Sequence, residues 1–266
     1  MSKKAMLYDA SRCTACRGCQ VACKQWNDLR GWDYSKTQNT GSYENPPDLS
    51  PETWMRISFQ EYEDKQGQLQ WLFLKRGCFH CHEAACVEVC PTHALKHDPT
   101  ADSVTVETAL CNGCGYCTQF CPFHIPRLEA NVLTGAGKSS KCTLCQDRIS
   151  NGVLPACVQT CTADALSFGD WDQMVALGNA RVEAIKPRLP KANLYGASIL
   201  GGLGSLYVLL QEPEVYGLPT NPTYTVANIW QEVVQPVAEV SFGVGVLLAG
   251  IAFIIARRHI RMEDVE

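Results

Sequence analysis

Apolar and polar residues alternate in two neighbouring segments of the first half of the chain. The segments WMRISFQEY (residues 54–62) and LQWLFLK (residues 69–75) flank the turn-forming sequence DKQG. Alternation on both sides of such a turn predicts a β-hairpin. A shorter strand, turn and strand is predicted over residues 94–108, ALKHDPTADSVTVET. The polar stretch from Asp28 to Pro51, with its glycines and prolines, predicts a loop.

Two later stretches carry no charge and are long enough to raise the question of a membrane helix. The first, Ala192 to Leu210, is rich in glycine and serine, which favours a packing segment over a lipid-facing helix, although a span remains an alternative. The second, Val240 to Ala256, reads VSFGVGVLLAGIAFIIA. As a helix extended back to Pro236 it would rise about 30 Å, the thickness of a bilayer core. We expect a transmembrane helix over 236–256, the alternative being a buried core helix.

Flanking charge predicts how this helix is oriented. The sequence RRHIR directly follows it, so the positive-inside rule places residues 257–266 in the cytoplasm as a basic tail. The cysteine-rich part would then lie on the opposite, periplasmic face. Ser241, Gly245 and Ala249 recur every four residues and could allow close approach of another membrane helix, or reflect only the usual composition of spans. The opening MSKKAMLYDAS lacks the apolar run of a signal peptide.

Cysteine content changes this picture most. The chain of 266 residues has 16 cysteines, all between Cys13 and Cys161. They form four runs: Cys13-x2-Cys16-x2-Cys19-x3-Cys23, Cys78-x2-Cys81-x4-Cys86-x3-Cys90, Cys111-x2-Cys114-x2-Cys117-x3-Cys121 and Cys142-x2-Cys145-x11-Cys157-x3-Cys161. Such spacing is typical of bacterial ferredoxins, which bind [4Fe-4S] clusters. A disulfide framework or structural zinc is the weaker alternative, because neither repeats this spacing.

Ferredoxin chemistry also predicts how the cysteines are shared. The first three cysteines of a run hold one cluster, and the fourth binds the neighbouring cluster. Runs two and three then form one pair, and runs one and four are left as partners by elimination. The predicted ligand sets are cluster 1, Cys13, Cys16, Cys19 and Cys161; cluster 2, Cys78, Cys81, Cys86 and Cys121; cluster 3, Cys111, Cys114, Cys117 and Cys90; and cluster 4, Cys142, Cys145, Cys157 and Cys23.

Basic residues and histidines lie near these runs. A [4Fe-4S] cluster with four thiolates carries roughly −2, so nearby cations would offset its charge. Candidates, each of which could equally be an ordinary surface residue, are Arg17, Lys24, Arg127, Lys138, Lys141 and Arg148. Five histidines are expected to be second-layer donors or surface residues, because each cluster already has four cysteines: His80, His82, His93, His97 and His124.

With these features the chain resembles the iron-sulfur (beta) subunits of respiratory formate dehydrogenases, within the four-cluster subunits of molybdopterin oxidoreductases. The resemblance rests on the four runs, the opening CTACRGCQVACKQWN, the segment YGASILGGLGSLYVL and the single C-terminal span. Run four departs from many relatives by having Cys161-Thr162 instead of Cys-Pro. The presence of all 16 cysteines argues against the nitrate reductase branch, where tryptophan replaces one.

The resemblance implies an electron-transfer subunit with no catalytic site of its own. Electrons would arrive from a catalytic subunit carrying molybdenum or tungsten on two pterin cofactors, which oxidises formate. They would leave towards a membrane cytochrome b-type subunit and quinone. The alternatives are the equivalent subunit of another molybdopterin oxidoreductase, of the sulfur-compound or dimethyl sulfoxide type, and a free-standing polyferredoxin. Lipid is expected to contact the C-terminal helix, and no nucleic-acid partner is expected.

The predicted fold class is α+β, with two pseudo-twofold ferredoxin-like modules, four [4Fe-4S] clusters, inserted hairpins and one C-terminal transmembrane helix. Residues 1–190 form the four-cluster region. Its module A combines residues 13–23 and 142–161, its module B covers 78–128, and an insertion covers 24–77. A packing segment and linker, 191–235, leads to the helix at 236–256 and the tail at 257–266.

Overall fold

The computed structural model describes residues 3–31, 43–64, 67–130, 137–223 and 234–259. Parts of the predicted loop (32–42), of the linker (224–233) and of the tail (260–266) therefore lie outside the described residues. The chain divides into two compact units, Met1–Thr223 and Tyr224–Glu266, and each is described by itself.

A four-stranded sheet forms the centre of the first unit, in the order β8-β1-β10-β9. Its strands are β1 (Lys4–Asp9), β8 (Leu166–Asp170), β9 (Asn193–Tyr195) and β10 (Ser205–Leu209). β1 runs parallel to β10 and antiparallel to β8, so Met6 lies between Ser205 and Phe168. Residues 193–209 thus contribute two strands to the core, which confirms the expectation that this stretch packs within the protein.

Alternation along β1 sends its side chains to two different layers. Ala5 and Leu7 pack with Leu206 and Val208 against helix α6 (Trp171–Ile185) in a buried apolar cluster. Tyr8 lies on the opposite face, where its ring is 5.5 Å from that of Tyr207. Because period-two alternation separates the faces of a strand, one face binds a helix and the other is free to support the cysteine-bearing segments.

The predicted hairpin lies against this second face. β2 (Arg56–Glu63) and β3 (Leu69–Arg76) pair antiparallel, with Phe59 opposite Phe73, which confirms the prediction. Two tyrosine hydroxyls of the sheet fix β3: Tyr8 Oη donates to Phe73 O at 2.8 Å and Tyr207 Oη donates to Lys75 O at 3.0 Å. The second predicted strand pair is also present, as β4 (Leu95–His97) and β5 (Val104–Val106).

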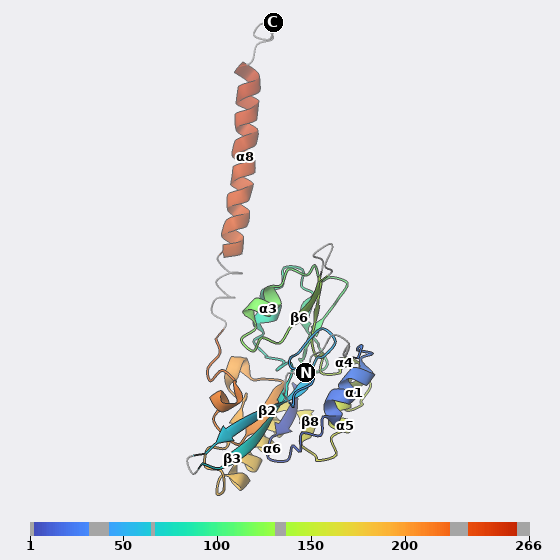
Figure 1. The fold of residues 1–266 in the computed structure, drawn as a ribbon. Helices are drawn as coiled ribbons and strands as arrows, with labels where there is room; N and C mark the ends of the chain where they lie inside the picture. Colours follow the sequence, from blue (N-terminus) through green and yellow to red (C-terminus); the bar gives the residue numbers. More distant parts are fainter. Residues whose placement is uncertain (1–2, 32–42, 65–66, 131–136, 224–233, 260–266) are drawn as a thin grey trace. The chain divides into compact units, whose positions relative to one another are not determined.

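Short helices and turns carry most of the cysteines. The helices are α1 (Gly18–Trp26), α2 (Ala85–Glu88), α3 (Tyr116–Phe120), α4 (Gln146–Ser150) and α5 (Ala156–Gln159). The remaining elements are β6 (Arg127–Ala130), β7 (Gly137–Ser140) and the 3-10 turns η2 (Ile199–Gly201) and η3 (Pro213–Tyr216). α1 packs against α5 and α2 against α3, so segments far apart in sequence lie side by side (Figure 1).

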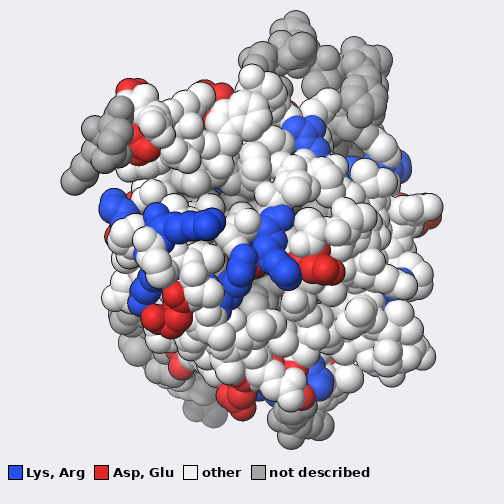
Figure 2. All heavy atoms as spheres, turned by 90° about the horizontal axis from the view of Figure 1, so that it is seen from below, with Lys and Arg blue, Asp and Glu red and all other residues white. Residues whose placement is uncertain are grey.

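Charged side chains of both signs occupy the surface of this unit. On the face drawn in Figure 2, basic side chains gather near the centre and acidic ones lie beside and around them. Several such charges are paired, as in Lys4 with Asp170 at 2.6 Å and Arg181 with Asp9 at 2.7 Å. Asp9 is buried, whereas the pair of Lys4 and Asp170 is partly exposed, and exposed pairs contribute little to stability.

The second unit contains one long helix, α8 (Gln235–His259). Within the described residues it is the single helix long and apolar enough to cross a membrane, and an 18-residue window within Gln235–Arg257 has a mean hydropathy of 2.2. Its apolar side chains are exposed, Phe242 by 76%. Ser241 satisfies its hydroxyl inside the helix by donating to Val237 O at 2.6 Å.

Candidate metal-cluster sites

The fold gathers the cysteines into four groups of four. Three hollows are each lined by one group, and the members of the remaining group lie close enough to influence one another electrostatically. The first group comprises Cys13, Cys16, Cys19 and Cys161. The second comprises Cys78, Cys81, Cys86 and Cys121. The third comprises Cys90, Cys111, Cys114 and Cys117. The fourth comprises Cys23, Cys142, Cys145 and Cys157. These are the same sets that the cysteine spacing grouped.

The donor chemistry of each group fits a polynuclear cluster. All 16 cysteines are free thiols. Four thiols around a hollow match the ligation of a [4Fe-4S] cluster.

A left-handed residue shapes the start of each run. The second residue after the first cysteine has positive φ in all four: Ala15, His80, Gly113 and Leu144. This conformation costs a residue with a side chain about 1–2 kcal/mol, and such strain is characteristic of functional sites. It also turns the backbone N–H towards sulfur. Ala15 N donates to Cys13 Sγ and Leu144 N to Cys142 Sγ, both at 3.4 Å.

A second shared turn follows the last cysteine of runs two, three and four. The third residue after this cysteine has positive φ and donates its backbone N–H to the carbonyl of the cysteine. His93 donates in this way to Cys90 at 3.1 Å, and His124 donates to Cys121 at 3.0 Å. In run four, Asp164 does the same to Cys161 at 3.3 Å. Thr162 in place of proline therefore leaves the turn intact.

Gly113 offers a direct test of how tightly the third group is built. A Cβ at this position would lie 2.4 Å from Gly137 O, and its φ of +75° is also unfavourable for alanine. We expect Gly113→Ala to lower the Tm by several degrees and to reduce the iron content, because β7 must move. Gly152→Ala is the matched control, since Gly152 has φ +71° but no atom within 4 Å. Equal Tm values for the two variants would contradict this packing.

Burial keeps many of the thiols protonated unless metal replaces the proton. It raises the pKa of Cys121 to about 11 and those of Cys19, Cys145 and Cys157 to about 12, with neighbouring cysteines adding to the effect in Cys19, Cys145 and Cys157. Thiolates in such surroundings need positive charge nearby, which iron supplies when bound. The burial of the thiols and the set of four donors therefore both fit a bound iron-sulfur cluster.

Hydrogen bonds to sulfur also come from residues outside the runs. Ser139 on β7 donates its backbone N–H to Cys111 Sγ at 3.3 Å, and its Oγ lies 3.4 Å from Cys117 Sγ. Asn27 Nδ2 donates to Cys23 Sγ at 3.7 Å. Such contacts adjust the potential of a cluster. Sequence reasoning missed Ser139, because its short polar segment carries no pattern that indicates a contact with sulfur.

The basic residues singled out from the sequence play unequal roles. Four of them mainly bind backbone carbonyls or aromatic rings and thereby hold loops: Arg17, Lys24, Arg127 and Arg148. Lys138 donates to Cys111 O at 2.6 Å. Lys141 is buried and donates to Val104 O and, at 3.0 Å, to Cys142 O.

Sequence reasoning missed the most enclosed cation of all, Lys75 near the end of β3. Its side chain lines the hollow of the fourth group and is 1% exposed. Burial lowers the pKa of Lys75, but electrostatic interactions with Tyr207 and with Cys157, Cys142 and Cys19 outweigh burial and raise it. Its ammonium Nζ has no hydrogen-bond partner within the part of the chain that the structure describes. An unpartnered buried ammonium fits a neighbouring anionic group.

The histidines separate into buried and turn-forming residues. His80 is fully buried, and its pKa is lowered by burial and by Lys141 and Lys75, which keeps its ring neutral. His82 Nδ1 lies 3.1 Å from Gly201 O, and His97 Nδ1 lies 3.0 Å from Asp102 Oδ1. His93 and His124 occupy the left-handed turns described above. Cysteines, not these rings, line the hollows.

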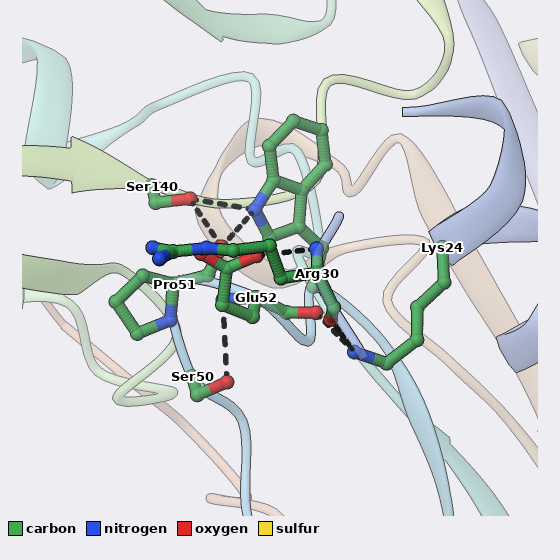
Figure 3. A network of polar contacts seen from close by, with 7 residues as sticks. Lys24, Arg30, Ser50, Pro51, Glu52 and Ser140 are labelled. Carbon is green, nitrogen blue, oxygen red and sulfur yellow. Dashed lines mark hydrogen bonds and ion pairs between the residues drawn. The ribbon is translucent and has the colours of Figure 1, made fainter. Parts of the chain in front are cut away.

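The insertion joins the two ends of the cysteine-rich region (Figure 3). Lys24 on α1 donates to Glu52 O at 2.5 Å. Arg30, which lies beyond the end of α1, donates through Nε to Glu52 Oε1 at 2.9 Å. Next to Glu52, Pro51 O accepts from Ser140 Oγ on β7 at 2.9 Å. A further link is direct: Trp26 Nε1 donates to Asp147 Oδ2 on α4 at 2.8 Å. Runs one and four are therefore connected in two ways, through the insertion and by the direct bond from Trp26 to Asp147.

Comparison with known proteins agrees with this description. Two family models, each described as a 4Fe-4S dicluster domain, match residues 12–94 and 69–171. The thiol groups and these domains define an iron-sulfur protein of the ferredoxin-like class that transfers electrons.

Its relatives narrow the class. The formate dehydrogenase iron-sulfur subunit of Haemophilus influenzae is 39% identical over 98% of this chain and 83% of its own length. The nitrate-inducible formate dehydrogenase iron-sulfur subunit of Escherichia coli K12 is 39% identical over 90% of this chain and 80% of its own. Formate dehydrogenase 2 subunit beta (cytochrome c-553) of Nitratidesulfovibrio vulgaris is 36% identical over 80% of this chain and 96% of its own length. The chain belongs to the iron-sulfur subunits of formate dehydrogenases, which confirms the family expected from its sequence.

Proposed function

We propose that this chain conducts electrons from a formate-oxidising catalytic subunit to the membrane through four [4Fe-4S] clusters, one in each cysteine group. The observation that carries the proposal is the separation of 16 free thiols into four groups of four within one compact unit. When bound, a [4Fe-4S] cluster takes up and gives back a single electron without making or breaking bonds to substrate.

The protein's own residues hold the clusters and set their surroundings. Thiolates from two runs would close each group, so the cysteine at the end of one short helix serves the neighbouring cluster. Buried side chains such as Met6, whose Sδ is 3.9 Å from Cys157 Sγ, exclude water from the fourth group. Backbone N–H groups aimed at sulfur favour the more negative, reduced state.

We propose two modules within residues 1–190. Module A combines residues 13–23 with 142–161, and module B spans 78–128. The packing of α1 against α5 and of α2 against α3 supports this division, because each contact joins the two runs of one module. The insertion, residues 24–77, would brace module A through Glu52 and Trp54.

Membership of this family supports a proposal for the partners. The catalytic subunit would carry molybdenum or tungsten on two pterin cofactors, and a cytochrome b-type subunit would accept the electrons and reduce quinone. α8 would anchor the chain in lipid, with the cluster unit on the periplasmic face and residues 257–266 in the cytoplasm. Its length of 25 residues corresponds to about 37 Å, sufficient to span a bilayer core.

A pull-down from membranes tests the proposal. The tagged chain should copurify with a large subunit containing molybdenum or tungsten, and the complex should reduce a dye with formate as donor. Iron and sulfide analysis should give four [4Fe-4S] clusters per chain. Copurification of a large subunit that reduces dimethyl sulfoxide or a sulfur compound, without formate activity, would contradict the assigned donor.

A further inference from the structure

Lys75 occupies a position that the binding of clusters does not by itself require. Lys75 lies near the end of β3. This strand is fixed to the central sheet by two hydrogen bonds, from Tyr8 to the carbonyl of Phe73 and from Tyr207 to the carbonyl of Lys75. The side chain is 1% exposed, and a Cβ at Gly77 would lie 3.4 Å from its Nζ. A rigid strand therefore holds the ammonium in the interior, and solvent does not reach it.

Two cysteine groups face this ammonium. Lys75 lines the hollow of the fourth group together with Cys142 and Cys157. Ile57, which lies opposite Lys75 in the hairpin, lines the hollow of the first group, which contains Cys19. Within the described residues its Nζ has no hydrogen-bond partner, so no carbonyl or carboxylate offsets its charge. The ammonium thus lies in the hollow of the fourth group, and its hairpin partner lies in that of the first, the two groups that we assign to module A.

The physical consequence concerns reduction. A cluster with four thiolates becomes more negative by one charge when it gains an electron, so a nearby fixed cation stabilises the reduced form more than the oxidised form. Little water screens this interaction, because the site is buried. A cation near two clusters therefore raises the reduction potentials of both.

We propose that Lys75 is a positioning residue for electron transfer, a fixed cation that raises the reduction potentials of the clusters in the first and fourth groups together. The inference rests on the proposed cluster ligands. It assigns to the insertion an electrostatic role, because the hairpin β2–β3 is the element that brings this charge to module A.

Lys141 provides a matched comparison at the next junction. It too is buried, and it acts on Cys86 and Cys121 of the second group and on Cys142 of the fourth. Unlike Lys75, its Nζ donates to two carbonyls, Val104 O and Cys142 O. The two lysines thus share the fourth group but differ in the other group that they face.

The experiment is a redox titration of the full complex followed by electron paramagnetic resonance, with Lys75→Met, Lys75→Arg and Lys141→Met. Signals are assigned to the first and fourth groups by their loss in Cys16→Ala and Cys145→Ala. In Lys75→Met we expect the potentials of those two clusters to shift negative and the other two to stay at wild-type values. In Lys75→Arg the reduction potentials should lie closer to the wild-type values. In Lys141→Met the reduction potentials of the clusters in the second and fourth groups should shift, and that of the first should not change.

Unchanged potentials in Lys75→Met, with all clusters present, would overturn the inference and leave the proposed function intact. Equal shifts of all four clusters would also overturn it, since they would indicate a general disturbance. If Lys75→Met loses iron, Lys75→Gln is titrated instead. Loss of iron from both neutral variants would mean that the ammonium serves assembly and not potential. A wild-type complex without four clusters would instead refute the proposed function.

Discussion

Replacement of Cys117 by alanine is expected to remove one [4Fe-4S] cluster and to reduce formate-dependent quinone reduction at least about 100-fold, equivalent to about 2.7 kcal/mol of activation free energy. Cys117 is buried on α3 and lines the hollow of the third group. A missing cluster lengthens one electron jump, and the rate of such a jump falls steeply with distance. Dye reduction at the catalytic subunit should persist, because it does not require the whole path.

Gln119→Ala is the matched control, because Gln119 is an exposed residue of the same short helix. Iron content, electron paramagnetic resonance and quinone reduction should be unchanged in that variant. Quinone reduction that survives in Cys117→Ala while the cluster signal is absent would refute a single linear path through all four groups.

A chain truncated after Thr223 is expected to leave the membrane fraction. The cut lies at the boundary between the two compact units and removes α8, the apolar helix over Gln235–Arg257. Alkaline carbonate washing followed by centrifugation distinguishes an inserted helix from a chain held only by other proteins. We expect the full chain in the pellet and the truncated chain almost entirely in the supernatant.

The control for this truncation is a chain that ends at His259, which keeps α8 and lacks only the final residues. Leu247→Arg tests membrane insertion of α8 independently, because arginine at the centre of a transmembrane helix raises the free energy of insertion by about 2.5–3.5 kcal/mol. A truncated chain that resists carbonate extraction would show that α8 is not the anchor.

Local patterns predicted the hairpins well because each is encoded within a few residues. The alternation of apolar and polar residues on either side of DKQG is sufficient to predict β2 and β3. The central sheet could not be predicted in this way. β1 pairs with β10 across nearly the whole length of the first unit, and no local period reports such a partner.

The missed residues have the same explanation. Lys75 follows an apolar run and looks like the polar end of a strand, yet Tyr207 from a distant strand fixes it inside the protein. Ser139 lies in a short polar segment, GKSS, that gives no indication of a contact with sulfur. Residues near the cysteines in sequence, such as Arg17 and Arg127, proved mainly to hold loops. Proximity along the chain was therefore a weak guide to proximity in space.

The pairing of β1 with β8 and β10 has a consequence for the order in which the protein matures during synthesis. Residues 78–121 contain every thiol of the second and third groups, so those groups can be completed while the ribosome is still translating the rest. The first and fourth groups must wait for Cys161 and Cys157, and the strand beside Cys13 stays without one neighbour until residues 205–209 emerge. Iron loading should accordingly proceed from the middle of the chain outwards.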